Sequence, residues 1–291
     1  MKKWISSIVG LSFALACPIA AFAQAPKVVP PNILFVETDN IKAYNTEAYD
    51  KVAAEYPPVF AQLKATPHFL AMDSMTGSPR AMYCTRYDTF EAFQKDSEKF
   101  ASDPAWHSEL SVLDAREAPY VAESHNTLWH YRPDLSNNIE GADIPHTHYW
   151  EALIFHMHPG HDLQFDEMTK LYRDASVKSG QNVPWATFEA LMGATDSYLV
   201  LVPMTSLKDE DVSLAHKQDF MAALGDKGMQ QFAKLNSEGV ATVEDNIWMV
   251  NPASSYVEKS WVDADPKYWA PKPAAKRANG AAPASKPPAE K

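Results

Sequence analysis

The chain has 291 residues, 46% of them hydrophobic, so it is long and apolar enough to build a packed core. Its formal net charge is −11 at pH 7. Because both ends of the chain are basic, the body between them is more acidic still, which argues against nucleic-acid binding, since that requires a basic face.

The first 23 residues have the three parts of a secretory signal peptide. Lys2 and Lys3 precede an apolar stretch over residues 4–15, and Ala21-Phe22-Ala23 supplies a small-x-small cleavage site. The apolar stretch is shorter than the roughly 20 residues that a membrane anchor needs. We therefore expect a signal peptide at residues 1–23, a periplasmic or secreted protein, and no integral membrane segment in the mature chain. A retained N-terminal anchor is the alternative.

Cysteine usage fits an exported protein without internal disulfides. Once residues 1–23 are removed, only Cys84 remains, and its apolar surroundings predict a buried side chain rather than a catalytic thiol. Lipid attachment at Cys17 is an alternative fate of the N-terminus, although Ala14 and Pro18 fit a lipoprotein motif poorly.

Hydrophobic patterning predicts a βαββαβ order of elements in a first repeat, residues 32–136. Apolar residues recur every three or four positions along residues 45–63, as in a helix with one buried face, and Pro57 and Pro58 predict a kink or a restart there. The expected elements are a strand at 33–36, a helix at 45–63, strands at 68–75 and 81–87, a helical region from Thr89 with an Asp88–Glu91 capping box, and a strand at 126–131.

A second repeat, residues 146–256, shows the same order. The expected elements are a strand at 149–158, a helix at 162–179, strands at 185–192 and 198–202, a helical region at 208–235 and a strand at 246–250.

Identical residues at corresponding positions of the two halves indicate a duplication. Gly77 and Gly193 each stand in the turn between the second and third strands, and a threonine follows each glycine after twelve residues, Thr89 and Thr205. A βαββαβ unit has an antiparallel sheet with both helices on one face. The predicted fold class is therefore α+β, with two tandem ferredoxin-like units whose open sheet faces cover each other in a pseudo-dimeric α/β barrel.

Four segments carry a resemblance to a known family. They resemble secreted, duplicated members of the dimeric α/β-barrel superfamily, the NIPSNAP-like and antibiotic-biosynthesis-monooxygenase-like group, over roughly residues 32–256. The segments are Leu70–Gly77, Tyr87–Phe93, Pro159–Asp162 and Val200–Ser206. The resemblance implies a fold far more than an activity, because the superfamily includes cofactor-free oxygenases, haem-handling enzymes and proteins with no assigned chemistry, and it transfers no catalytic residue.

Histidines are concentrated in residues 146–161. His146, His148, His156 and His158 share even parity with Trp150, so a single regular strand would place them on one side of the sheet, whereas a bulge would split them. Aligning the repeats sets His156 and His158 opposite Val36 and Thr38, so the fold itself does not demand imidazole there. The candidate ligand-binding residues are His148, Trp150, His156 and His158, with Tyr83 and Arg86 lining the equivalent pocket of the first repeat.

Three interpretations of these histidines remain open. They line a pocket between sheet and helices that binds a small apolar or aromatic ligand, with a cofactor-independent oxygenase or isomerase as the expected chemistry and histidine moving the proton. Alternatively, the histidines of residues 146–161 bind haem or a transition metal. For a transition metal, His156 and His158 are the expected ligands and Glu151 or Glu189 completes the set. In the third interpretation they are exposed and have no such role.

Other function classes are less supported. No glycine-rich phosphate loop, nucleophile elbow or Ser-His-Asp arrangement occurs, so the expected cofactor is none. A non-catalytic, envelope-associated binding or assembly module is a further alternative. The partners expected are a small-molecule ligand and no nucleic acid, and the chain is expected to be a monomer with an internal pseudo-dimer, or a homodimer.

Residues 266–291 are rich in proline, alanine and lysine and nearly lack large aliphatic side chains. Such a segment cannot bury enough apolar surface to offset the entropy lost on ordering. We therefore predict a disordered, extended tail.

Cleavage of the signal peptide has a direct test. When the full chain is expressed in a bacterial host, we expect the exported form to begin at Gln24, as read by N-terminal sequencing and intact mass. A mature protein that keeps Met1, or that carries a lipid on Cys17, contradicts this prediction.

Overall fold

The computed structural model describes residues 29–270. The predicted signal peptide at residues 1–23, Cys17 and the tail beyond Ala270 lie outside the described residues. None of the helices within residues 29–270 combines the length and the hydrophobicity that crossing a membrane requires.

Two runs of four strands with intervening helices follow one another along the described chain. Unit 1 contains β1 (Ile33–Ile41), α1 (Thr46–Ala53), α2 (Tyr56–Gln62), β2 (Phe69–Ser74), β3 (Arg80–Tyr87), α3 (Phe90–Ser102), α4 (Pro104–Glu117) and β4 (Val121–Tyr131). Unit 2 contains β5 (Tyr149–Met157), α5 (Asp162–Lys178), β6 (Ala186–Met192), β7 (Ser197–Met204), α6 (Lys208–Ala215), α7 (Lys217–Gly239) and β8 (Val240–Val250). Three short 3₁₀ turns join the units, Pro133–Leu135, Ile139–Gly141 and Ile144–His146.

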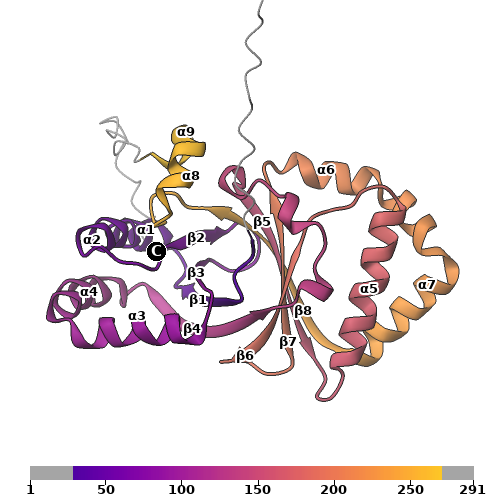
Figure 1. The fold of residues 1–291 in the computed structure, drawn as a ribbon, viewed down its shortest axis with the longest axis horizontal. Helices are drawn as coiled ribbons and strands as arrows, with labels where there is room; N and C mark the ends of the chain where they lie inside the picture. Colours follow the sequence, from indigo (N-terminus) through magenta and orange to yellow (C-terminus); the bar gives the residue numbers. More distant parts are fainter. Residues whose placement is uncertain (1–28, 271–291) are drawn as a thin grey trace, which may run out of the picture.

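Within the described residues the eight strands form one closed barrel in the order β1-β3-β2-β8-β5-β7-β6-β4. Unit 1 contributes β4-β1-β3-β2 and unit 2 contributes β8-β5-β7-β6, which is the same order in both. The antiparallel pairs β2–β8 and β4–β6 join the units edge to edge, so each of these eight strands has a neighbour on both sides. Helices α1–α4 flank the sheet of unit 1 and α5–α7 that of unit 2 (Figure 1). The predicted fold class of two tandem ferredoxin-like units in a pseudo-dimeric barrel is confirmed.

Side chains from all eight strands fill the barrel interior. Trp129 of β4 and Trp248 of β8 occupy matching places in the two units, and both are almost fully buried. Strand alternation requires that every second residue of each strand enters this core. The free thiol of Cys84 is buried in it, as the sequence predicted, and burial raises the pKa of that thiol to about 12.

Two C-terminal helices, α8 (Lys259–Ala264) and α9 (Pro266–Trp269), cover one end of the barrel. Trp261 and Trp269 are buried in the barrel core, and Trp269 Nε1 donates to the carbonyl oxygen of Pro145 at 2.8 Å. The prediction of a disordered tail from Pro266 onward is therefore wrong for residues 266–269. These residues form α9, and the aromatic side chains at 268–269 anchor this helix to the barrel.

Register shifts correct the alignment of the repeats. β1 shifts register between Asn40 and Ile41, and β5 shifts between His156 and Met157. Ile41 therefore corresponds to Met157, and His156 aligns with Asn40 rather than with Val36.

Several helix and strand ends differ from the sequence prediction. Pro57 and Pro58 mark a restart, as predicted, since they stand in the first turn of α2. The predicted Asp88–Glu91 capping box is wrong, because Thr89 is the N-cap residue of α3 and its Oγ1 accepts from the backbone N–H of Ala92.

Arg132 fixes α5 against the barrel. It follows β4 and donates to Glu189 of β6 at 2.7 Å, to Asp166 of α5 at 3.1 Å and to Asp134 at 2.8 Å. Because one guanidinium donates to three carboxylates, it links helix α5 to strand β6 and so fixes the distance between this helix and the unit 2 sheet.

The turn before β7 leads to a stability prediction. Gly193 has a φ of +91°, and a Cβ added there would lie 2.2 Å from the carbonyl oxygen of Asn126. Gly160 has a φ of +81°, but no atom of the described residues lies within 4 Å of such a Cβ. Gly160→Ala should therefore cost about 1–2 kcal/mol from backbone strain alone, whereas Gly193→Ala must also displace β4. We expect the Tm of Gly193→Ala to fall further, by at least about 2–4 °C, in thermal unfolding. Equal Tm values for the two variants contradict the close approach.

Candidate functional site

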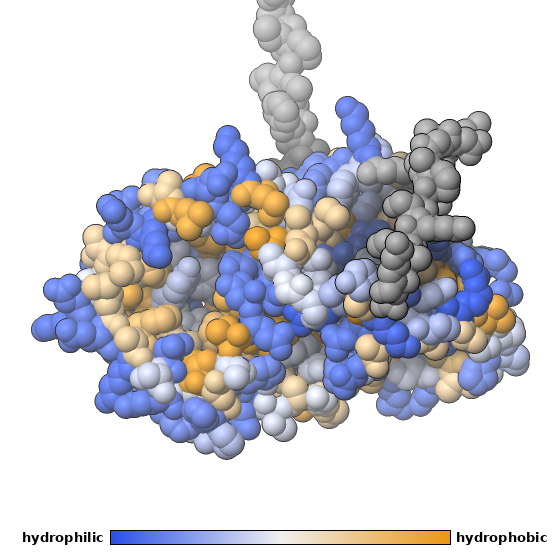
Figure 2. All heavy atoms as spheres, turned by 180° about the vertical axis from the view of Figure 1, so that it is seen from behind, coloured by the Kyte–Doolittle hydropathy of each residue, from blue (hydrophilic) through white to orange (hydrophobic). Residues whose placement is uncertain are grey.

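A cavity of about 630 Å³ lies between the outer face of the unit 2 sheet and helices α5–α7. Figure 2 shows apolar side chains gathered around a hollowed part of the surface on the unit 2 half, which is on the left in this view from behind. Its apolar lining includes Leu153, Phe155, Phe165, Met168, Tyr172, Trp185, Val200, Val202, Val212 and Phe232.

Strand alternation builds the sheet side of the cavity. On β5, Glu151, Leu153 and Phe155 face the cavity, while Trp150 and Ala152 face the barrel core. The strand therefore gives an apolar wall with one carboxyl group in it.

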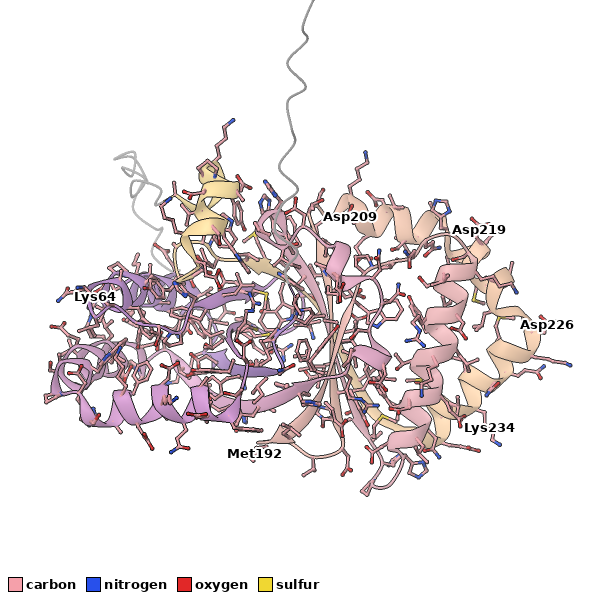
Figure 3. All side chains as sticks on the ribbon, in the orientation of Figure 1. Lys64, Met192, Asp209, Asp219, Asp226 and Lys234 are labelled. Carbon is pink, nitrogen blue, oxygen red and sulfur yellow. The ribbon has the colours of Figure 1, made fainter. Side chains whose placement is uncertain are left out.

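The helix side of the cavity is incompletely filled. Helix α6 has no buried residue, and residues 211–219 are all exposed, so this segment stands over the sheet without packing into it. Asp219, Asp226 and Lys234 of α7 point outward (Figure 3). Trp185 closes the floor, and its Nε1 donates to the carbonyl oxygen of Leu135 at 2.9 Å.

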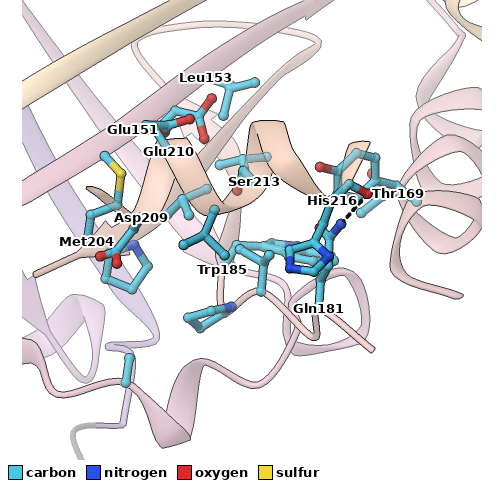
Figure 4. A pocket seen from close by; sticks show the side chains of 18 of the residues that line it. Glu151, Leu153, Thr169, Gln181, Trp185, Met204, Asp209, Glu210, Ser213 and His216 are labelled. Carbon is cyan, nitrogen blue, oxygen red and sulfur yellow. Dashed lines mark hydrogen bonds between the residues drawn. The ribbon is translucent and has the colours of Figure 1, made fainter. Parts of the chain in front are cut away.

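One end of the cavity is acidic. Glu151 of β5 and Glu210 of α6 lie close to each other there (Figure 4). Burial, together with the neighbouring negative charges of Asp245 and Glu210, raises the pKa of Glu151 to about 7. Burial also raises the pKa of Glu210. Among the described residues, no lysine or arginine lines the cavity.

The other end carries neutral polar groups and one imidazole. Gln181 donates to the backbone carbonyl of His216 at 2.8 Å, and His216 Nδ1 lies 3.0 Å from Asp219 Oδ2. The cavity thus runs from a carboxyl-lined end, past apolar walls, to a polar end (Figure 4).

The candidate residues that the sequence placed in and beside β5 do not line this cavity. Trp150 is buried in the barrel core. His148 stacks on Tyr268 with ring centroids 3.7 Å apart, and its Nε2 lies 2.9 Å from Asp265 Oδ2. His156 Nδ1 lies 2.9 Å from the hydroxyl of Ser197 at the far end of the strand. The expectation that these side chains line a pocket between sheet and helices is wrong for this cavity, because even-numbered positions of β5 face the barrel interior.

The remaining predicted residues are also dispersed. His158 is exposed beyond the register shift, so it does not share a surface with His156. Arg86 is exposed and donates to the carbonyl oxygen of Val29 at 2.9 Å. Arg86 and Trp150 both line a separate cavity of about 90 Å³ at one end of the barrel interior.

The residues that the structure describes do not fit the transition-metal alternative. Among the described residues, no three His, Cys, Asp or Glu side chains are placed to hold a metal ion, and Glu189 is bonded to Arg132. Within the same part of the chain, His216 is the one imidazole lining the large cavity. A haem in this cavity would find no lysine or arginine among the described lining residues to neutralise its propionates.

The matching space in unit 1 is packed with side chains. Tyr49 Oη donates to Asp39 at 2.7 Å and lies 2.8 Å from the hydroxyl of Tyr83. Tyr83 is therefore part of this packed group and does not line an open pocket. Burial, together with the charge of Asp39, raises the pKa of both Glu37 and Glu117 beside this group to about 7.

Sequence reasoning named Glu151 only as a completing metal ligand and did not name Glu210. The sequence did hold a signal, since a glutamate stands among aromatic and aliphatic residues in the strand Tyr149–Met157, where His156 is the other strongly polar side chain. Glu210 carries no comparable signal, because it lies in the acidic first turn of α6 among other carboxylates.

Comparisons with known proteins bear on the fold only. No protein-family model matches the chain, and no curated protein matches its sequence. Among solved structures, an anthrone oxidase-like protein is 14% identical, with 78% of this chain and 94% of that one covered at a TM-score of 0.49. A protein described as a monooxygenase from Fusobacterium nucleatum is 12% identical, covering 77% and 94% at 0.48. A mutant chlorite dismutase from Candidatus Nitrospira defluvii is 10% identical, covering 80% and 96% at 0.46.

At these identities and TM-scores the likenesses carry no conclusion about chemistry. The strand order of this chain itself is that of two ferredoxin-like sheets closing one barrel, which is the pseudo-dimeric α/β barrel expected from the sequence.

The raised pKa values predict that the protein is less stable at pH 8 than at pH 5. A carboxyl with a pKa of about 7 when folded and 4.5 when unfolded holds its proton more tightly in the folded chain. The free energy of unfolding therefore falls as the pH rises through this interval. We expect Glu151→Gln to reduce the fall in Tm between pH 5 and pH 8, and Glu109→Gln, at an exposed position of α4, to leave it unchanged. The same dependence in wild type and Glu151→Gln contradicts the assignment.

Proposed function

We propose that this protein binds a small, largely apolar organic molecule in the cavity between the unit 2 sheet and helices α5–α7. The observation that carries the proposal is the cavity itself, about 630 Å³ in volume with mostly apolar walls and a few polar groups at its two ends. Binding sites for small molecules typically have about 300–1,000 Å³ and this composition.

The geometry supports one chemical step in the cavity. Glu151 has a pKa of about 7, so it can take up or release a proton near neutral pH, which is the property required of a general acid or base. If the bound molecule is converted, an isomerase-type proton transfer, or the proton removal that begins a cofactor-independent oxygenation, would use Glu151 rather than a histidine of β5.

The single chain already closes the barrel, so binding in unit 2 needs no second copy. We also propose that the protein acts in the periplasm or outside the cell, on the basis of the signal-like sequence at residues 1–23.

Blocking the cavity tests the proposal. Ser213 of α6 lines the cavity, and Ser237 of α7 is exposed and does not. We expect a panel of small aromatic compounds to raise the Tm of the wild type, because a ligand that binds only the folded state stabilises it. Ser213→Trp should abolish the rise and Ser237→Trp should retain it. A wild-type Tm that no compound moves, or a rise that survives in Ser213→Trp, refutes binding in this cavity.

A further inference from the structure

We propose that the molecule bound in the unit 2 cavity carries a cationic amine on an apolar body, with the ammonium group held between Glu151 and Glu210. This inference rests on the proposed function and names the ligand class of the same site.

Glu151 and Glu210 supply the carboxyl groups of the acidic end, and the side chain of Asp245 on the neighbouring strand is hydrogen-bonded to Glu151. Asp209, the other acidic residue of α6 in this lining, is already occupied, since its carboxylate accepts from the backbone N–H of Thr205 at 3.0 Å. Glu151 and Glu210 come from opposite walls, one from the sheet and one from the helix, and they approach each other across the cavity (Figure 4).

The acidic end lacks a positive counterpart from the described part of the chain. No lysine or arginine of residues 29–270 lines the cavity, and His216 is at the opposite end, beside Asp219. A half-buried carboxylate without a cation is unfavourable, and an opposite charge within hydrogen-bond distance relieves that cost. An ammonium group on the ligand would supply this charge, whereas a ligand carboxylate or phosphate would be repelled.

The walls beyond the acidic end suit an aromatic or aliphatic body. Tyr172 and Trp185 pack edge to face with centroids 5.7 Å apart, and Leu153 and Val200 form the opposite, sheet side. These side chains contribute apolar area along most of the cavity. An arylalkyl amine therefore matches the polarity of the site at both its acidic end and its apolar walls.

Proton linkage follows from the same geometry. The titratable groups that face Glu151 are Asp245 of β8, Glu210 of α6 and Tyr172 of α5, and all are acidic. An ammonium ion favours ionised Glu151, so binding should release a proton and strengthen as the pH rises. With a pKa of about 7, the ionised fraction of Glu151 grows about tenfold between pH 6 and pH 8.

Three probes of similar size distinguish the possibilities. Residues 24–291 are titrated by calorimetry with 2-phenylethylamine, 2-phenylethanol and 3-phenylpropionate. We expect the amine to bind at least about tenfold more tightly than the alcohol, the propionate to bind more weakly than both, and the affinity for the amine to rise about tenfold from pH 6 to pH 8.

Near-isosteric variants locate the effect. Glu151→Gln and Glu210→Gln should each lower the affinity for the amine about tenfold while leaving that for the alcohol unchanged, and Glu151→Gln should flatten the pH dependence. Asp226→Asn, which removes an equal charge from an exposed, outward-facing position of α7, should change neither.

The outcomes separate the two proposals. If the alcohol or the propionate binds as tightly as the amine, the amine inference is wrong and small-molecule binding stands. If the amine binds best but the glutamine variants keep its affinity, Glu151 and Glu210 are not its partners and the inference fails. If none of the three binds, the inference fails together with the proposed binding of small aromatic molecules.

Discussion

Closure of the barrel is the constraint on which the rest of this structure depends. The pairs β2–β8 and β4–β6 join two sheets whose edges would otherwise be open. Because side chains alternate along a strand, closure assigns one set of residues on every strand to a common core. That core is packed with tryptophans and aliphatic side chains from all eight strands. A large ligand site therefore has to be built on the outer face, where helices stand over the sheet.

The two units use that outer face in different ways. In unit 1 the space under the helices is filled by buried aromatic groups such as Tyr49 and Trp106 and by the carboxyl groups bonded to tyrosines. In unit 2 the helix α6 contributes no buried side chain, and the space beneath it stays open. The chain thus contains two units of the same fold. The space between sheet and helices is filled in unit 1 and open in unit 2, and both units are needed to close the barrel.

The order of elements could be predicted from the sequence because periodic apolar residues and the Pro57-Pro58 pair mark the helices and strands locally. The early parts of β4 and β8 could not, because residues 122–126 and 241–245 are exposed on both faces and show no regular alternation of apolar and polar side chains. The shared parity of His148, Trp150 and His156 was also visible in the sequence. Which side of the sheet that parity faces depends on pairing between strands far apart in the chain, so the sequence alone does not show that Trp150 faces the barrel interior.

The central claim is that the ligand site lies outside the barrel, at the acidic end of the unit 2 cavity. A crystal structure with 2-phenylethylamine bound measures this most directly. We predict the ring beside Trp185 and the nitrogen within hydrogen-bond distance of a carboxylate oxygen of Glu151 or Glu210. Density for the amine inside the barrel beside Trp150, with the outer cavity holding only solvent, would contradict it.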